Sequence, residues 1–356
     1  MTFTIDELVV PESLASPGGD DFIACIALSN AVEAHVVGTT ILSPTPDELL
    51  PEYRSNPTRA RSHFLARVDG IPVGRAIVTT RPRTPGVGAH VVVDVLPEHR
   101  GRGIGAALLA RVEAAAAAEG ESTLKVSIAH TVDTPGERIA PPTGFGDLPA
   151  DDPGVRFLRH HGFVLEQVSR ISVLDTAGLG DRLPGFLATS RSFAGDDYAV
   201  RSWVGPTPSA RLDDLAVLRT RMSTDAPMAG LQAPPDLWDA ARIEAHDARI
   251  GEGGQTVLTT AAEHLPTGRL VGFSEIFVPD GRTSAMQQDT LVLREHRGRR
   301  LGLLLKASTA RDLLREAPHV DTVITYNAEE NRPMLDVNEA MGFRPIGYEG
   351  GWQRRS

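Results

Sequence analysis

Two stretches of this 356-residue chain nearly repeat each other. The first reads EHRGRGIGAALLARVEAA from Glu98, and the second reads EHRGRRLGLLLKASTARD from Glu295, 197 residues later. Other landmarks follow in the same order, because VGRAIV matches VGFSEIFV upstream and HGF matches MGF downstream. Several landmarks that recur in one order over a long period predict a tandem repeat of one domain.

The segment Asp175–Asp197 is rich in Gly, Ser and Asp, which is typical of a connection between domains. We therefore expect a first domain over residues 1–185 and a second over residues 186–356. A chain of this length, with 41% hydrophobic and 23% charged residues, can bury two modest cores.

Both repeats show the same order of predicted elements. In the first, HFLARVDGIPVGRAIVTT predicts a hairpin that turns at Asp69-Gly70, and the valine-rich GAHVVVDVLP predicts a third strand. The loop EHRGRG then opens a helix that ends at Gly120, and STLKVSIAH predicts a further strand. The second repeat gives TVLTTAAEH, RLVGFSEIFV, AMQQDTLVL, a helix, VDTVITYN, a short helix and a last strand to Trp352. The expected fold class is α+β, with a mixed sheet flanked by helices in each domain.

Composition excludes several classes of protein. The formal net charge of −10 argues against a general nucleic-acid binder, which needs a basic face. No apolar run is long enough for a membrane span, and the N-terminus MTFTIDELVV lacks the features of a signal peptide. The single cysteine, Cys25, is expected in the core. We expect a cytoplasmic protein without a membrane or nucleic-acid partner, and a homodimer is left open.

The repeated loop has the chemistry of an anion site. Where a strand ends, turns through glycines and opens a helix, unpaired backbone N–H groups point outward at the positive end of the helix dipole. The loop lacks the Walker lysine and serine and lacks the Rossmann glycine pattern, so a nucleoside triphosphatase or a dinucleotide enzyme is not indicated. The alternative is a glycine-rich turn with solvated arginines, which two copies after a strand make less attractive.

These residues resemble the GNAT N-acetyltransferase superfamily. VLPEHRGRGIG from Val95 fits the acyl-CoA loop of that family, and VLREHRGRRLG from Val292 fits it except at Arg300. The resemblance covers about residues 60–175 and 198–352, and it implies a splayed mixed sheet and acetyl-CoA as the cofactor. It assigns backbone contacts with the pantetheine or the acetyl oxygen to Val95 and Val292. It assigns the pyrophosphate to Arg100, Gly101, Arg102, Gly103, Ile104 and Gly105 in the first repeat and to Arg297, Gly298, Arg299, Arg300, Leu301 and Gly302 in the second.

The second family motif is incomplete in both repeats. Members of the family commonly have an asparagine eleven residues before the Gly of the final Gly-Phe and a tyrosine four residues before it. In the second repeat these positions hold Asn331, which fits, and Asn338, which does not; in the first they hold Asp151 and Leu158. Neither repeat therefore has the tyrosine that would protonate the leaving thiolate.

The general base is also unassigned by the resemblance. The family glutamate on the third strand is replaced by Ala89 in the first repeat and by Met286 in the second. A base is needed because an alkyl ammonium is not nucleophilic at neutral pH. The substitutes within reach are His90 and Asp94 in the first repeat and Glu275 and Asp289 in the second, although each could be an ordinary strand side chain.

We predict that the second repeat is the catalytic half, because Asn327, Asn331 and Glu275 are expected to converge there. Its catalytic candidates are Glu275, Asp289 and Asn338. The resemblance implies an acetyl-CoA-dependent N-acetyltransferase that acts on the primary amine of a small molecule by direct attack. A mycothiol-synthase-like tandem acetyltransferase and a non-catalytic acyl-CoA sensor or scaffold are kept as alternatives.

One long excursion distinguishes the repeats. Residues 130–154 of the first repeat form a 25-residue stretch rich in Pro and Gly, whereas the second repeat crosses the same gap with NAEENRPM. Such a loop is either functional or disordered. We expect it either to cover a site or to be an insertion.

Overall fold

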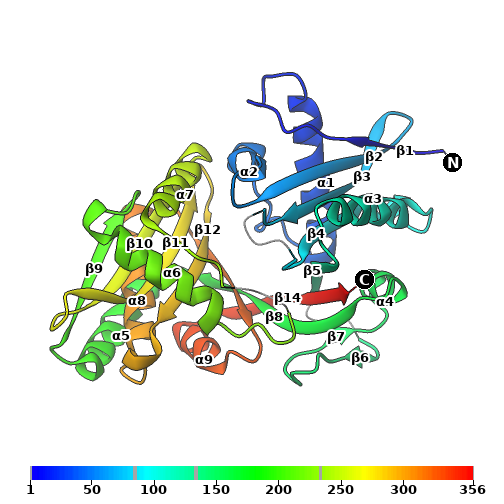
Figure 1. The fold of residues 1–356 in the computed structure, drawn as a ribbon. Coiled ribbons are helices and arrows are strands. Elements are labelled where there is room, and N and C mark those ends of the chain that lie inside the picture. The colour runs from blue at the N-terminus through cyan, green and yellow to red at the C-terminus, as the bar shows by residue number, and fades with distance from the viewer. Residues whose placement is uncertain (1, 83–85, 132–134, 232–234, 356) are drawn as a thin grey trace. The chain divides into compact units, whose positions relative to one another are not determined.

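The computed structural model describes residues 2–82, 86–131, 135–231 and 235–355 (Figure 1). Its internal contacts divide the chain into two compact units. Unit 1 consists of Met1–Ser169, Met228–Gln232 and Gly347–Ser356, and unit 2 consists of Arg170–Pro227 and Ala233–Ile346. Neither unit is one continuous stretch of sequence.

This division differs from the expected boundary at residues 185/186. The segment Asp175–Asp197 is not a connection, because it contains helix α5 (Leu179–Ala194). Leu179 and Leu183 of α5 are buried in a hydrophobic core of unit 2. Phe186 and Leu187 pack against the same core, and the surrounding Gly, Ser and Asp hid this apolar face in the sequence.

Unit 1 is built around a mixed sheet. Its strands lie in the order β1-β2-β3-β4-β5-β14-β8, where β8 (Val164–Asp175) contributes the residues up to Ser169. The other elements of the unit are β1 (Thr4–Glu7), α1 (Gly19–Val37), α2 (Pro46–Tyr53), β2 (Ala60–Val68), β3 (Ile71–Thr80), β4 (Ala89–Val95), α3 (Ile104–Ala118), β5 (Thr123–Thr131), β6 (Arg138–Ile139), β7 (Leu148–Pro149), α4 (Pro153–His160) and β14 (Arg344–Arg355).

Local sequence signals account for the centre of unit 1. The hairpin β2–β3 turns at Asp69-Gly70 as expected, and both residues have a positive φ (51° and 81°), which suits a two-residue turn between twisted strands. Helix α3 buries Leu108 and Val112 against the sheet and ends before Gly120, as its spacing predicts. Within residues 130–154, the described part contains the two-stranded β6–β7 pair.

The last strand of the chain belongs to unit 1. Strand β14 pairs antiparallel with β5 over nine residues, from Gly347↔Thr131 to Arg355↔Thr123 (Figure 1). Trp352 on β14 is 1% exposed and lies in the hydrophobic core of unit 1. The first repeat therefore completes its sheet with a strand from the far end of the sequence.

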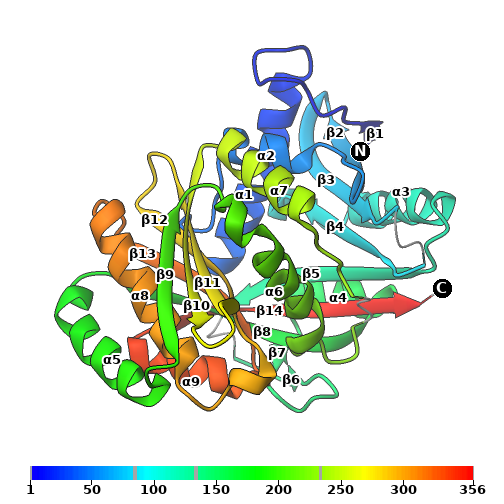
Figure 2. The same ribbon diagram turned by 60° about the vertical axis from the view of Figure 1, so that its left-hand side comes forward.

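Unit 2 repeats the same plan. Its strands follow the order β13-β12-β11-β10-β9, in which β12–β13 is parallel and the pairs β11–β12, β10–β11 and β9–β10 are antiparallel (Figure 2). Its elements besides α5 and the end of β8 are β9 (Tyr198–Val204), α6 (Leu212–Asp225), α7 (Ala240–Glu252), β10 (Gln255–His264), β11 (Arg269–Pro279), β12 (Ser284–Val292), α8 (Leu301–Glu316), β13 (Thr322–Ala328) and α9 (Arg332–Met341). The pairs β4–β5 and β12–β13 are both parallel, as the repeat requires.

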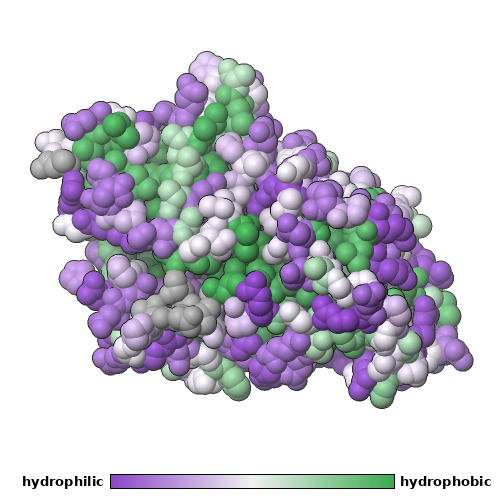
Figure 3. All heavy atoms as spheres, turned by 180° about the vertical axis from the view of Figure 1, so that it is seen from behind, coloured by the Kyte–Doolittle hydropathy of each residue, from purple (hydrophilic) through white to green (hydrophobic). Residues whose placement is uncertain are grey.

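Apolar side chains are buried in separate hydrophobic cores in each unit. Cys25 is 1% exposed and packs with Phe22 and Leu65 under α1, as the sequence predicts for this residue. Polar residues cover most of the face of the molecule that Figure 3 shows, with smaller apolar areas between them. None of the described helices is long and apolar enough to span a membrane.

Candidate functional site

The two repeated loops adopt the same backbone conformation. In unit 1, Gly101 and Gly103 have φ values of 72° and 80°; in unit 2, Gly298 and Arg300 have values of 81° and 54°. Gly103 and Arg300 are the residues that immediately precede α3 and α8. Arg300 therefore adopts the left-handed conformation that glycine takes at no cost, and the second loop keeps its shape in spite of the substitution.

The backbone amides of both loops are available to a ligand. Within the described residues, five amides of the first loop donate no recorded hydrogen bond: those of Gly101, Gly103, Ile104, Gly105 and Ala106. In the second loop the same holds for Gly298, Arg299, Arg300, Leu301 and Gly302. Such groups at a helix N-terminus are suited to bind the oxygens of a phosphate.

One arginine in each loop holds the loop against the preceding strand. Nε of Arg100 donates to the Val95 carbonyl at 3.0 Å, and Nε of Arg297 donates to the Val292 carbonyl at 2.9 Å. Val95 and Val292 are the residues whose backbone groups the family resemblance assigned to the pantetheine or the acetyl oxygen, and these bonds use one acceptor site of each carbonyl. A ligand would therefore contact the other acceptor site or another backbone group of Val95 and Val292.

The remaining arginines of the second loop have partners inside unit 2. Arg297 also forms an ion pair with Asp225 at 3.3 Å. The guanidinium of Arg299 lies over Tyr198, and that of Arg300 lies 3.9 Å from the ring centroid of Phe193. The arginine side chains of the second loop are therefore engaged in contacts within unit 2.

A cavity opens in each unit where two parallel strands separate. Strands β4 and β5 pair at Ala89↔Leu124 and His90↔Lys125, and no pairing is recorded beyond these residues. Strands β12 and β13 pair from Ser284↔Thr322 to Gln287↔Thr325 and then diverge in the same way. The family resemblance predicts this splay as the path of the pantetheine.

The cavity of unit 1 is large and reaches the loop. Its volume is about 990 Å³, near the upper end of the range of about 300–1,000 Å³ that is common for small-molecule sites. Gly101, Gly103 and Gly105 line it together with residues of β4, β5, α1, α4 and β14. An added Cβ at Gly105 would lie 3.3 Å from the ring of Phe157, so glycine keeps this part of the cavity open.

Charged side chains on the lining of this cavity are of both signs. The groups that can carry positive charge are His99 and Arg100 of the loop, Arg156, His160 and His161 of α4 and its C-cap, and the buried Arg75 of β3. Two of the acidic groups are already engaged: Asp94 pairs with the buried Arg75 at 2.7 Å, and Asp152 accepts the backbone amides of α4.

The two other carboxyl groups on the cavity lining are unpaired. Within the described residues, Glu33 of α1 and Glu349 of β14 have no recorded hydrogen bond or ion pair. Burial, and secondarily the negative charge of Asp94, raises the pKa of Glu33 to about 7. Burial, and secondarily the charge of Glu33, raises the pKa of Glu349 to about 7. A carboxylate that titrates near neutral pH can accept a proton from an amine.

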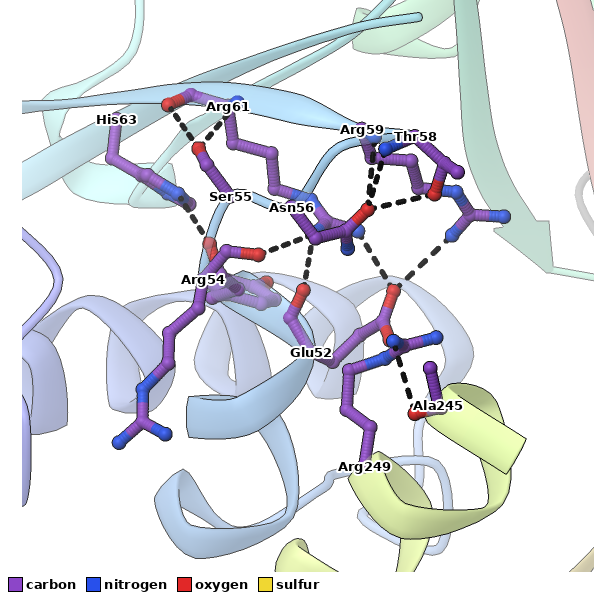
Figure 4. A network of polar contacts seen from close by, with 11 residues as sticks. Glu52, Arg54, Ser55, Asn56, Thr58, Arg59, Arg61, His63, Ala245 and Arg249 are labelled. Carbon is purple, nitrogen blue, oxygen red and sulfur yellow. Dashed lines mark hydrogen bonds and ion pairs between the residues drawn. The ribbon is translucent and has the colours of Figure 1, made fainter. Parts of the chain in front are cut away.

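A polar network fixes the segment between α2 and β2 in unit 1 (Figure 4). Oε1 of Glu52 accepts from Arg59 at 3.2 Å and from Arg61 at 2.7 Å, and the Tyr53 carbonyl contacts Nε2 of His63 at 3.3 Å. The hydroxyl of Tyr53 accepts a hydrogen bond from Arg75 at 3.1 Å. The network thereby holds the arginine that pairs with Asp94 on the cavity lining.

The cavity of unit 2 is smaller and does not include the loop. Its volume is about 220 Å³, and its lining comes from β12, β13, α6, α8 and α9 and the turn before α9. None of residues 297–302 is part of that lining. The second loop and this cavity are therefore not joined as they are in unit 1.

The structure brings together only some of the candidates in the second repeat. Asp289, Asn327 and Asn331 line the cavity of unit 2. Glu275 does not: it is 1% exposed, and both of its oxygens accept from Arg219, at 2.8 and 3.0 Å. Asn338 is 2% exposed and donates to Oδ1 of Asn327 at 2.6 Å, so its amide supports a cavity residue from behind.

Sequence reasoning did not find Glu33 or Glu349. It considered His90 and Asp94 in the first repeat, of which Asp94 is held by Arg75 and His90 is exposed, and Glu275 and Asp289 in the second. Glu349 reaches the cavity only because β14 pairs with β5 of unit 1, opposite Ala129. No local signal in GYEGGWQ indicates that partner.

Comparisons with known proteins show which protein family the chain belongs to. The model of the acetyltransferase (GNAT) family matches residues 31–136. A curated mycothiol acetyltransferase of Clavibacter michiganensis subsp. michiganensis (strain NCPPB 382) is 30% identical over 288 residues, which cover 80% of this chain and 78% of that protein. The chain therefore belongs to the GNAT acetyltransferase family, and it is an acyltransferase with two GNAT-like domains in tandem.

Solved structures agree on the fold over the whole chain. A tandem GNAT protein from the clavulanic acid biosynthesis pathway superposes with a TM-score of 0.73 at 23% identity, and covers 99% of this chain and 98% of its own. A GCN5-related N-acetyltransferase from Sphaerobacter thermophilus gives a TM-score of 0.62 at 15% identity, with coverage of 99% and 95%. At these identities the likeness concerns the fold, and the predicted tandem α+β architecture is confirmed.

Proposed function

We propose that unit 1 binds acetyl-CoA and transfers its acetyl group to the primary amine of a small molecule. The observation that carries this proposal is the 990 Å³ cavity, which joins the loop glycines to the unpaired carboxylates Glu33 and Glu349. This assignment places the chemistry in the first repeat and replaces our preference for the second. The reason is that Glu275 is occupied by Arg219 and the cavity of unit 2 excludes its own loop.

The loop residues would hold the pyrophosphate. The amides of Gly101, Gly103, Ile104, Gly105 and Ala106, which donate no recorded hydrogen bond within the described residues, lie at the N-terminus of α3, where the helix dipole favours an anion. Arg156 lies on the same cavity, and its guanidinium can pair with phosphate oxygens. The lining between β4 and β5 leads from the loop to the carboxylates and would take the pantetheine.

Glu349 is the proposed general base. Acetyl-CoA supplies the thioester, whose C–S bond breaks as the amine nitrogen forms the new C–N bond. The Glu349 carboxylate accepts the proton that the attacking nitrogen must lose. The thiolate that departs takes a proton from water, because no tyrosine is available at position 158 or elsewhere on the described lining. Glu33 acts through Glu349, since its negative charge raises the pKa of that carboxyl.

Release of free thiol from acetyl-CoA tests the proposal. Purified full-length chain is incubated with acetyl-CoA and a panel of small primary amines, and thiol and acetylated amine are measured together. We expect amine-dependent thiol release in equal amounts with acetylated product. If the chain binds acetyl-CoA but releases no free thiol with any amine, the result would contradict the proposal that the chain is an enzyme and would favour the sensor alternative. Propionyl-CoA and succinyl-CoA in parallel test whether acetyl is the preferred group.

A second acceptor is suggested by the mycothiol acetyltransferase relative. The panel therefore includes an amino sugar conjugated to cysteine, whose free α-amine is a primary amine. Preferential turnover of that compound would identify this chain as a mycothiol-type acetyltransferase. Turnover of simple amines at a comparable kcat/KM would exclude that specificity.

A further inference from the structure

A lysine in unit 2 occupies a core position. Lys306 lies on α8 and is 2% exposed. The equivalent position of the first repeat, counted from the first helical residues Ile104 and Leu301, holds Leu109, which is 1% exposed in the core of unit 1. The position that holds an apolar core residue in the first repeat thus holds a buried amine in the second.

The amine of Lys306 has no recorded counter-charge within the part of the chain that the structure describes. Among the described residues, no hydrogen bond or ion pair to Nζ is recorded, and its nearest recorded contact is the Phe343 ring, whose centroid is 5.3 Å away. Burial alone lowers the pKa of Lys306 to about 7, with no charged neighbour contributing. A buried cation without a partner is unfavourable, and an aromatic ring compensates for it only in part.

Lys306 lines the cavity of unit 2 beside two carboxamides. Oδ1 of Asn327 is engaged by Asn338, which leaves the Nδ2 of Asn327 as a donor toward other partners. The side chain of Asn331 has no recorded hydrogen bond, although it lies at the N-terminus of α9. The cavity therefore combines one amine and two amide donors.

Asp289 also lines this cavity but is directed to another partner. Its Oδ2 lies 3.8 Å from Arg219, which also holds Glu275. No ion pair joins Asp289 to Lys306 in the described structure. No side chain in the described ranges therefore supplies a counter-charge to Lys306.

We propose that the cavity of unit 2 binds a small organic carboxylate, whose charge is countered by Lys306 and whose oxygens accept hydrogen bonds from Asn327 and Asn331. The volume of about 220 Å³ lies below the range of about 300–1,000 Å³ for drug-sized ligands, which limits the occupant to a few carbon atoms. The separation of the cavity from the second loop argues against a pantetheine there. The proposal does not depend on the proposed function of unit 1.

Binding of propionate to the full chain tests the proposal, with propionamide as the uncharged molecule of the same shape. Ligand-observed NMR gives the affinity, and thermal unfolding gives the stabilisation by ligand. The matched variant is Lys306→Met, which is unbranched and only one atom shorter than lysine and removes its charge. Lys306→Leu serves as a second variant, because the first repeat tolerates leucine at this position.

We expect propionate to bind and stabilise the wild-type chain, propionamide to do neither, and Lys306→Met to weaken propionate binding by about tenfold or more. Without ligand, both variants should unfold at a higher temperature than the wild type, since a buried unpaired amine is removed. Acetylation by unit 1 should continue in both variants. Equal effects of propionate and propionamide, or propionate binding that persists in both variants, would overturn the proposal. Loss of turnover in the folded variants would instead count against the assignment of acetyl transfer to unit 1.

Discussion

Units 1 and 2 have the same loop conformation but differ in the interior behind the loop. In unit 1 the loop glycines open into a cavity of 990 Å³ with two unpaired carboxylates. In unit 2 the cavity has 220 Å³, excludes the loop and contains a lysine in place of a core leucine. The two loops thus share one backbone conformation, whereas the side chains between the splayed strands differ, and we assign different roles to the two units on that basis.

Replacement of Glu349 should give the largest effect. Glu349→Gln removes the proposed base of unit 1, and we expect kcat to fall by about 10²–10⁴-fold with little change in acetyl-CoA affinity. Asp289→Asn is the matched change of a cavity carboxylate in unit 2, and it should leave kcat nearly unchanged. Steady-state kinetics of both variants decides between the units. A large fall in kcat for Asp289→Asn with little change for Glu349→Gln would assign the chemistry to unit 2.

The Arg219–Glu275 pair should be structural. Arg219→Met leaves the buried Glu275 carboxyl without its partner, and we expect a loss of about 3–5 kcal/mol in the free energy of unfolding. Double replacement with Glu275→Leu should recover part of that loss, because no buried charge is left unpaired. Chemical denaturation of the wild type, of Arg219→Met and of the double variant measures these free energies of unfolding. A catalytic role for Glu275 would appear as loss of turnover in Glu275→Gln under conditions where the variant is fully folded.

The pH profile should separate the roles of Glu33 and Glu349. A base must be ionised, so kcat/KM should rise with pH through the pKa of Glu349, which is about 7. Glu33→Gln removes a negative charge that raises this pKa, and the rising limb should therefore move to lower pH. Profiles of wild type and variant, measured with an amine of constant ionisation over the range, show the shift. If the rising limb of the kcat/KM profile lies at the same pH in Glu33→Gln as in the wild type, Glu33 does not interact with the base.

The smallest effect is expected at the position that distinguishes the loops. Arg300→Gly relieves a left-handed backbone in a non-glycine residue, worth about 1–2 kcal/mol, and loses the contact with Phe193, worth about 0.5–1 kcal/mol because both groups are exposed. The free energy of unfolding should therefore rise by about 1 kcal/mol or less, as measured by denaturation. A clear loss of stability would show that the Phe193 contact matters more than the backbone.

Local signals allowed much of the fold to be predicted from the sequence. The Asp69-Gly70 turn and the helix after each loop depend on residues close together in the chain. The tandem repeat was predicted from matching segments 197 residues apart, and the structure agrees with all three predictions. Helix α5 was mistaken for a connection, because the surrounding Gly, Ser and Asp hid its apolar face.

The candidate site was harder to predict because its parts are distant in sequence. Glu349 lies on the unit 1 cavity through the pairing of β14 with β5, and no periodicity reports which strand a terminal segment will join. The choice of Glu275 as a base could not anticipate Arg219, which comes from α6 and occupies both of its oxygens. Lys306 was not singled out, because a lysine in a helix is usually exposed to solvent and no local signal indicates that this one is buried.

The stoichiometry of coenzyme A binding tests the central claim most directly. Calorimetry on the full chain should give one equivalent, which Gly103→Glu abolishes by placing a negative charge among the loop amides. Gly103→Arg is the control, because Arg300 shows that the loop conformation accepts arginine, and it should retain one equivalent with weaker affinity. Arg300→Glu should leave the single site of unit 1 intact. Two equivalents for the wild type, or one equivalent that is lost in Arg300→Glu and kept in Gly103→Glu, would contradict the assignment of the acyl-CoA site to unit 1.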